Sequence, residues 1–185
     1  MDRRTFLSTI AIGALMTDAA VAQPALDPEN TIYLDVKYGR VIIQLRPDLA
    51  PHHVERVKIL SRQGFYDGTP FHRVIDGFMA QGGDPTGTGS GGSKLPDLKA
   101  EFTNNAHFLR GTVGAARTSA PDTANSQFFI CFAPAPFLDG QYTIWGQVVS
   151  GMEFVDQIKK GSGSSGSVSD PDKIIHMRVM ADVKS

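Results

Sequence analysis

The chain has 185 residues, of which 41% are hydrophobic and 20% are charged, and its formal net charge is −1. These values fit one soluble globular domain with a substantial hydrophobic core. Positive and negative charges nearly balance, so no basic stripe is available for a phosphate backbone, which argues against nucleic acid and anionic membranes as partners. The single cysteine, Cys131, excludes an intramolecular disulfide, a C-x-x-C redox pair and a cysteine-rich zinc site.

Residues 1–22 have the pattern of a secretory signal. The pair Arg3-Arg4 precedes an apolar run over residues 10–16 that is too short to span a bilayer, and Ala20-Val21-Ala22 is typical of a cleavage site. Adjacent arginines resemble a twin-arginine signal, but Asp2 stands where such signals usually carry Ser or Thr, so Sec export is an open alternative. Both routes lead out of the cytoplasm. We expect cleavage after about Ala22 and a periplasmic protein with no membrane contact beyond this signal.

The rest of the chain alternates short apolar stretches with turns. A disordered lead-in is expected over residues 23–30, followed by one folded domain over residues 31–185. Apolar runs and period-two alternation predict strands over residues 31–37, 41–45, 71–75, 78–81, 111–116, 127–132, 142–149 and 173–183. Helical spacing predicts two helices, from Pro51 to about Gly64 and over residues 151–159. Many strands without βαβ alternation favour a closed antiparallel barrel over an α/β sheet.

Residues 71–84 are expected to form a β-hairpin around the Asp76-Gly77 turn. Side chains alternate across a strand, so strict alternation would place Phe78 and Met79 on opposite faces. If both residues serve one site together with Arg73, the second strand must be irregular or bulged near Phe78.

Two segments rich in glycine are predicted to be loops. Residues 87–92 satisfy the pattern G-x-G-x-x-G, but Pro96 follows at once and no βαβ unit surrounds them, so a dinucleotide site is rejected in favour of a mobile surface loop. Residues 161–169 are almost all Gly and Ser and are expected to be a linker loop.

The sequence has no G-x-S-x-G elbow, no H-E-x-x-H motif and no obvious carboxylate pair, so nucleophilic and metal catalysis have no candidates and neither metal nor cofactor is expected. What remains is an arginine among aromatic residues, with an amide and a methionine nearby. This set suits a reaction that makes no covalent bond, such as rotation of an X-Pro peptide bond. Ordinary core packing and a structural ion pair of Arg73 are the alternatives for the same residues.

Three motifs together closely resemble the cyclophilins, which are peptidyl-prolyl isomerases. They are residues 71–84, Asn125-Ser126-Gln127-Phe128-Phe129-Ile130 and Phe137-Leu138-Asp139-Gly140. The resemblance extends from about Asn30 to about Val183, with the motifs in the family's order. It implies a mainly β fold, a closed eight-stranded antiparallel β-barrel capped by two α-helices.

The resemblance also implies the roles of individual residues. Arg73 is expected to be catalytic and Gln81 to contact the substrate and steady Arg73. The expected substrate-binding residues are Phe78, Met79, Ala116, Thr118, Phe129, Phe137, Leu138 and Tyr142. Phe137 and Tyr142 stand where the best-known eukaryotic members carry Trp and His, which predicts weak binding of cyclosporin-type drugs.

The resulting hypothesis is an exported, monomeric peptidyl-prolyl cis-trans isomerase that acts on proline-containing polypeptides and assists the folding of exported proteins. A chaperone or docking module with the same fold, in which isomerisation is incidental, is the competing hypothesis. A nucleotide-binding enzyme that uses the glycine loop is a third.

Overall fold

The computed structural model describes residues 25–184, so the predicted signal over residues 1–22 lies outside the described residues. It contains eight strands: β1 (Thr31–Val36), β2 (Gly39–Leu45), β3 (Arg73–Ile75), β4 (Met79–Gly82), β5 (Thr112–Ala115), β6 (Phe128–Cys131), β7 (Ile144–Ser150) and β8 (Ile174–Val179). The helices are α1 (Pro51–Arg62), α2 (Met152–Asp156) and the short 3-10 helices η1 (Pro28–Asn30), η2 (Pro136–Leu138) and η3 (Met180–Asp182). All the predicted strands and both predicted helices are therefore present.

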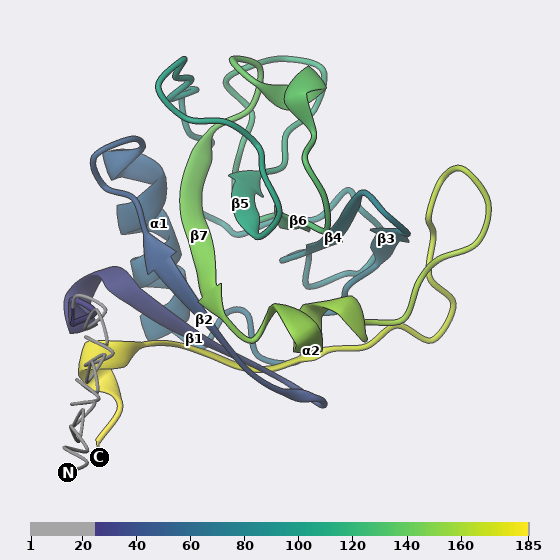
Figure 1. Ribbon diagram of the computed structural model, residues 1–185, viewed down its shortest axis with the longest axis horizontal. Coiled ribbons are helices and arrows are strands. Elements are labelled where there is room, and N and C mark those ends of the chain that lie inside the picture. The colour runs from purple at the N-terminus through teal and green to yellow at the C-terminus, as the bar shows by residue number, and fades with distance from the viewer. Residues whose placement is uncertain (1–24, 185) are drawn as a thin grey trace, which may run out of the picture.

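The eight strands form one antiparallel sheet in the order β3-β4-β6-β5-β7-β2-β1-β8, which curls into a half-barrel (Figure 1). The expectation of a closed barrel is not met, because β3 and β8 are the two edges of the sheet. Within residues 25–184, these edges are joined only just before β3, where an isolated bridge pairs Pro70 with Lys173 and Gly68 N donates to Ile174 O at 2.8 Å. The free edge of β3 is instead occupied by residues 161–168, where Val74 N donates to Gly166 O at 2.7 Å. A loop has thus taken the hydrogen bonds that a closing strand would need.

The main core lies inside the curl of the sheet. In β1, Ile32, Leu34 and Val36 alternate inward and are at most 4% exposed, which is the period-two pattern seen in the sequence. Trp145 of β7 is the largest fully buried side chain in this core.

A second, smaller cluster lies on the other side of the sheet around Met79, Phe129 and Leu138. It also contains Cys131, and burial raises the pKa of this thiol to about 12, as expected for an inert core cysteine. The second cluster underlies the candidate site.

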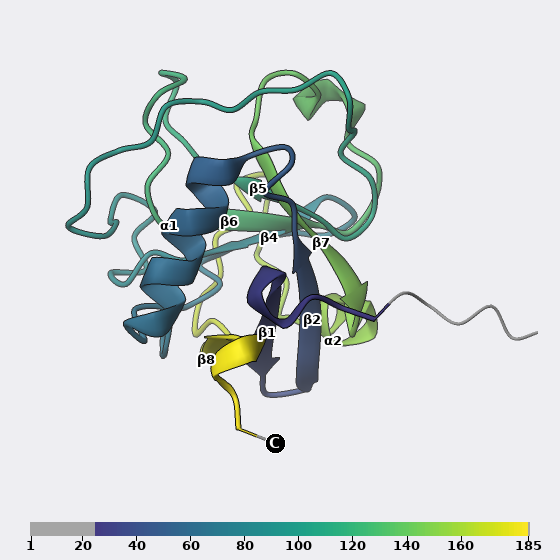
Figure 2. The same ribbon diagram turned by 90° about the vertical axis from the view of Figure 1, so that its left-hand side faces the viewer.

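Helix α1 packs against the sheet beside β7 and β8 (Figure 2). Pro51 occupies its first turn, and its inward stripe consists of Val54, Val57 and Leu60. No side chain of the helix caps its own N-terminus. The carboxylate of the distant Glu101 accepts hydrogen bonds from the N–H groups of residues 52 and 53 instead, at 3.1 and 3.0 Å.

The elements near the two chain ends differ from the expectations. Residues 23–30 are expected to be disordered, but Pro28–Asn30 form η1, and Glu29 makes an ion pair with Arg62 at 2.9 Å. The second helix was predicted over residues 151–159 and is shorter in the structure, where α2 ends at Asp156. The last strand ends at Val179 and continues as η3. Among the described residues, no helix is both long enough and apolar enough to cross a membrane.

Candidate active site

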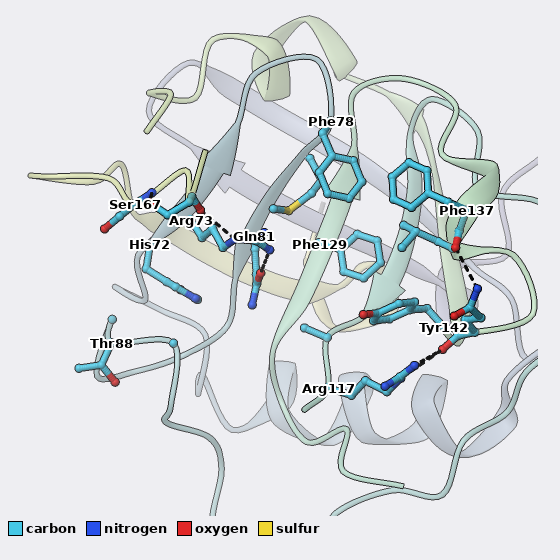
Figure 3. Close-up of a pocket in the computed structure, with 17 residues that line it drawn as sticks. His72, Arg73, Phe78, Gln81, Thr88, Arg117, Phe129, Phe137, Tyr142 and Ser167 are labelled. Carbon is cyan, nitrogen blue, oxygen red and sulfur yellow. Dashed lines mark hydrogen bonds between the residues drawn. The ribbon is translucent and has the colours of Figure 1, made fainter. Parts of the chain in front are cut away.

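An open groove of about 840 Å³ lies over the second hydrophobic cluster (Figure 3). It brings together nine of the ten predicted site residues: Arg73, Phe78, Met79, Gln81, Ala116, Phe129, Phe137, Leu138 and Tyr142. The tenth, Thr118, does not line this main groove. It lines an adjoining second groove of about 520 Å³, which shares Gln81, Gly89, Ala116 and Arg117 with the first.

Arg73 is held in the main groove by a chain of amide hydrogen bonds. It lies opposite Gln81 in the β3–β4 ladder, and its Nη1 donates to Gln81 Oε1 at 3.1 Å. Gln81 Nε2 donates in turn to Gln127 Oε1 at 2.9 Å, and Gln127 Nε2 donates to the carbonyls of Gly89 and Gly91. Every oxygen that accepts a hydrogen bond from Arg73 is neutral. The alternative of a structural ion pair for Arg73 therefore finds no support among the described residues.

The second anchor of Arg73 comes from the segment that the sequence suggests is a linker loop. Arg73 Nε donates to the carbonyl of Ser165 at 3.0 Å, and an isolated bridge pairs Arg73 with Ser167. Gly166 has φ +69°, and a Cβ there would overlap Ile75 Cγ1 and lie 3.0 Å from Val74 O. Glycine therefore lets this loop approach β3 closely enough to reach the guanidinium.

The floor of the groove is apolar. Met79, Phe129 and Leu138 are between 1% and 7% exposed, and their remaining surface faces the groove. Phe78 stands above them, with its ring centroid 5.2 Å from that of Phe137. These side chains form a cup that could hold a proline ring beside Arg73.

The bulge considered for the second strand is not present. The β3–β4 ladder has no register shift, and β4 begins only at Met79. Phe78 belongs to the preceding turn, where its N–H donates to Ile75 O at 3.0 Å. A turn residue is not bound by strand alternation, so Phe78 can face the same groove as Met79 and Gln81 without a bulge.

Phe137 and Tyr142 form the far side of the groove. Phe137 is 61% exposed, so its ring is available on the rim, and its carbonyl accepts a hydrogen bond from Gln141 Nε2 at 3.1 Å. The ring of Tyr142 packs edge-on against Phe129, with centroids 5.8 Å apart, and the guanidinium of Arg117 lies 4.4 Å from its centre.

Several residues at the groove were not predicted from the sequence: His72, Gly87, Thr88, Gly89, Arg117, Gln141, Ser165 and Ser167. His72 is 8% exposed, neither ring nitrogen has a hydrogen-bond partner among the described residues, and burial lowers its pKa below the ordinary value. The sequence could have suggested Arg117 and Gln141, because each of them lies directly beside a predicted site residue. The contact of Ser165 with Arg73 could not be found from the sequence, because a Gly/Ser segment does not indicate where it packs in the fold.

The chemistry of the groove is that of binding and orientation. Within residues 25–184, no three or more His, Cys, Asp and Glu side chains gather where they could hold a metal ion. The residues lining the main groove include two arginines and no carboxylate. The site therefore combines an apolar cup with oriented cationic donors, which suits recognition of a peptide bond next to an apolar ring.

A family model described as cyclophilin type peptidyl-prolyl cis-trans isomerase matches residues 31–179. The chain belongs to this family. It is 52% identical to a probable peptidyl-prolyl cis-trans isomerase of Brucella suis, with 98% of each chain covered. It is also 38% identical to human peptidyl-prolyl cis-trans isomerase-like 1, covering 76% of this chain and 85% of the relative.

Solved cyclophilin structures agree with this assignment. A Cryptosporidium parvum cyclophilin crystallised in the presence of the dipeptide Ala-Pro has a TM-score of 0.74 and 31% identity, covering 80% of this chain and 98% of that one. Cyclophilin AquaCyp293 from Hirschia baltica has a TM-score of 0.77 and 26% identity, covering 86% and 77%. The protein is thus a cyclophilin-type peptidyl-prolyl cis-trans isomerase of class EC 5.2.1.8. The predicted mainly β fold with eight antiparallel strands and two helices is confirmed.

Proposed function

We propose that the main groove is where this cyclophilin rotates X-Pro bonds and that Arg73 is its catalytic residue. The observation that carries the proposal is the setting of the Arg73 guanidinium, which is anchored by Gln81 and the Ser165 carbonyl above an apolar cup. An arginine with a structural role alone would be expected to pair with a carboxylate. Here the acceptors are an amide and a backbone carbonyl, and the side chain lines an open groove.

The barrier to rotation arises from amide resonance and amounts to about 18–20 kcal/mol. When the bond is twisted by about 90°, the prolyl nitrogen regains its lone pair and can accept a hydrogen bond, which it cannot do in the planar amide. Of the five N–H donors of Arg73, two are used by Ser165 and Gln81, so three remain for the substrate. One charge-assisted bond to the nitrogen contributes about 1.5–3 kcal/mol, or roughly 10- to 100-fold in rate.

The apolar cup supplies the remaining part of the mechanism. Phe78, Met79, Phe129 and Leu138 would hold the proline ring still and remove water from the amide. Loss of water disfavours the planar form, because that form has the larger charge separation. Ala116, Phe137 and Tyr142 would then contact the chain on either side of the proline, and Thr118 would contact residues that enter the second groove.

The decisive experiment is an NMR exchange measurement on an Ala-Pro peptide with the wild type, Arg73→Ala and Arg46→Ala. Arg46 is a matched control because it lies outside both grooves and pairs with Asp48 on the surface. We expect Arg73→Ala to lose about 10- to 100-fold in kcat/KM and Arg46→Ala to match the wild type. Equal rates in all three proteins would remove the role of Arg73. Equal suppression of client aggregation by wild type and Arg73→Ala would favour the chaperone hypothesis.

We further propose that the protein is exported, works as a monomer and assists the folding of other exported proteins. The support is the pattern of residues 1–22, with its arginine pair, apolar run and A-x-A site. Cell fractionation of the full chain and of a variant lacking residues 1–22 tests export. Replacing Arg3-Arg4 with two lysines separates the routes, because twin-arginine export should stop and Sec export should continue. Cytoplasmic retention of the full chain would contradict the proposal.

A further inference from the structure

Arg117 forms part of the wall that the main and second grooves share. Its guanidinium is fixed from several sides: Nε and Nη2 donate to Gln141 O at 3.1 and 2.8 Å, and Nη1 donates to the carbonyls of Thr118 and Ser119 at 2.9 and 3.2 Å. The planar group also lies over the ring of Tyr142, 4.4 Å from its centre. A long, flexible side chain is thus held in one orientation beside Tyr142 (Figure 3). It lies where the two grooves share lining residues.

The charge of Arg117 is oriented but not neutralised. All three of its acceptors are backbone carbonyls, which satisfy donors without cancelling a unit charge. Five of the eight arginines in residues 25–184 form ion pairs with carboxylates: Arg40, Arg46, Arg62, Arg110 and Arg178. Of the three that do not, Arg56 is buried, and the other two, Arg73 and Arg117, line the main groove.

Few negative charges oppose this pair of cations at the grooves. The lining of the main groove contains no Asp or Glu, although the whole chain has a net charge of −1. The second groove contains one, Asp97, whose Oδ1 accepts a hydrogen bond from Asn125 Nδ2 at 2.9 Å. A concave site with a surplus of one sign raises the local concentration of ligands with the opposite sign.

We propose that Arg117 is a specificity-determining residue that makes this isomerase favour peptides carrying an acidic side chain close to the proline. The proposal rests on the main groove being the substrate site. A carboxylate gains more than a neutral amide at this position because a hydrogen bond between opposite charges is the stronger one. The guanidinium is already immobilised, so little side-chain entropy is lost when the bond forms. Four of its five N–H groups are used by carbonyls, which leaves one on Nη2 for a substrate oxygen.

The first test compares peptides that place Glu, Gln or Lys at each of the positions flanking an Ala-Pro bond. Isomerisation by the wild type is followed by NMR exchange at low salt and again in about 0.5 M NaCl. We expect kcat/KM for Glu to exceed that for Gln by about 2- to 10-fold at one or more positions, with Lys lower than Gln. The preference should shrink in salt, because screening weakens an interaction between partly exposed charges.

The second test measures the same Glu-to-Gln ratio in three variants, so that changes in overall activity cancel. Arg117→Gln should bring the ratio to about one, and Arg117→Lys should retain part of it because the charge remains without the planar fork. Arg110→Gln is the control, since Arg110 pairs with Asp156 outside both grooves, and it should keep the wild-type ratio.

A ratio of one at every position in the wild type, or a preference that persists in Arg117→Gln, would overturn the proposal. Either result still leaves turnover of the Gln peptides measurable, so it is distinct from failure of the proposed function. Failure of the proposed function would instead appear as equal kcat/KM values of the wild type and Arg73→Ala for every peptide.

Discussion

Arg73 and Gln81 are direct partners across the β3–β4 ladder, and the hydrogen bond between Arg73 Nη1 and Gln81 Oε1 measures 3.1 Å. Neighbours across an antiparallel pair project to the same face, so the backbone register itself brings the amide to the guanidinium. Gln81 is held in turn by Gln127, because Gln81 Nε2 donates a hydrogen bond of 2.9 Å to Gln127 Oε1. The register of a short strand thus determines where the proposed catalytic group points.

Replacing Gln81 with Leu should lower kcat/KM for an Ala-Pro peptide by about tenfold. The change removes one of the two anchors of Arg73, so the guanidinium samples orientations that do not reach the prolyl nitrogen. NMR exchange measures the rate, and Gln63→Leu at the exposed C-terminus of α1 is the matched control. A Gln81→Leu protein as active as the wild type would show that the anchor at Ser165 suffices.

The loop over residues 161–169 provides a second prediction. Gly166→Ala should lower the free energy of unfolding by about 2–4 kcal/mol, because the new methyl group meets Ile75 and Val74 and because φ +69° disfavours alanine. Its kcat/KM should also fall, since the displaced loop carries the Ser165 carbonyl that holds Arg73.

Gly163→Ala is the matched control in the same loop. Gly163 also has a positive φ, of +65°, but no atom of the described residues lies within 4 Å of the position that a methyl group would take there. Its loss of stability should be only about 1–2 kcal/mol, from the backbone conformation alone, and its activity should stay at the wild-type level. Urea denaturation and NMR exchange measure the two quantities. Equal losses in both variants would show that the contact with β3 is unimportant.

The pH dependence should separate this mechanism from acid–base catalysis. Burial lowers the pKa of His72 below its ordinary value, so this ring is already neutral between about pH 7.5 and 9. A guanidinium does not act as an acid or a base in that range. We expect kcat/KM to be flat over that range. A bell-shaped profile in the exchange assay would indicate a titrating catalyst that the groove does not reveal.

His72 should also make the free energy of unfolding depend on pH. Its pKa is lower in the folded protein than in the unfolded chain, so the unfolded chain takes up the proton first as the pH falls below about 6.5. The free energy of unfolding should therefore decrease with falling pH in that window. His72→Gln should weaken this dependence in urea titrations at several pH values, and an unchanged slope would contradict the assignment.

Phe137 gives a prediction for drug binding. It keeps an apolar ring on the rim but lacks an indole N–H, so a cyclosporin carbonyl that a Trp would satisfy must find water or another donor. Binding should be weaker by about 1–3 kcal/mol, or roughly 5- to 150-fold, than in a member with Trp there. Phe137→Trp should recover part of this loss with little change in peptide turnover. Equal, tight inhibition of both proteins in the isomerase assay would refute this interpretation.

Local patterns in the sequence predicted the strands and both helices, whereas the resemblance to the cyclophilins predicted nine of the residues that line the main groove. The strands and helices follow from interactions between close neighbours in the chain. Alternation in β1 places Ile32 and Leu34 in the core, and the Asp76-Gly77 turn makes β3 and β4 a hairpin. Once the hairpin forms, its register brings Arg73 to Gln81, so this part of the site is local.

Only the tertiary structure showed how the remaining parts come together. Nothing in a run of Gly and Ser indicates that Ser165 meets Arg73, 92 residues earlier, and occupies the edge where a closed barrel would need a strand. Arg117 likewise owes its orientation to the carbonyl of Gln141, 24 residues away. Backbone carbonyls are the same at every position, so their long-range hydrogen bonds leave no pattern in the side chains, and only packing of the whole chain determines which donor they meet.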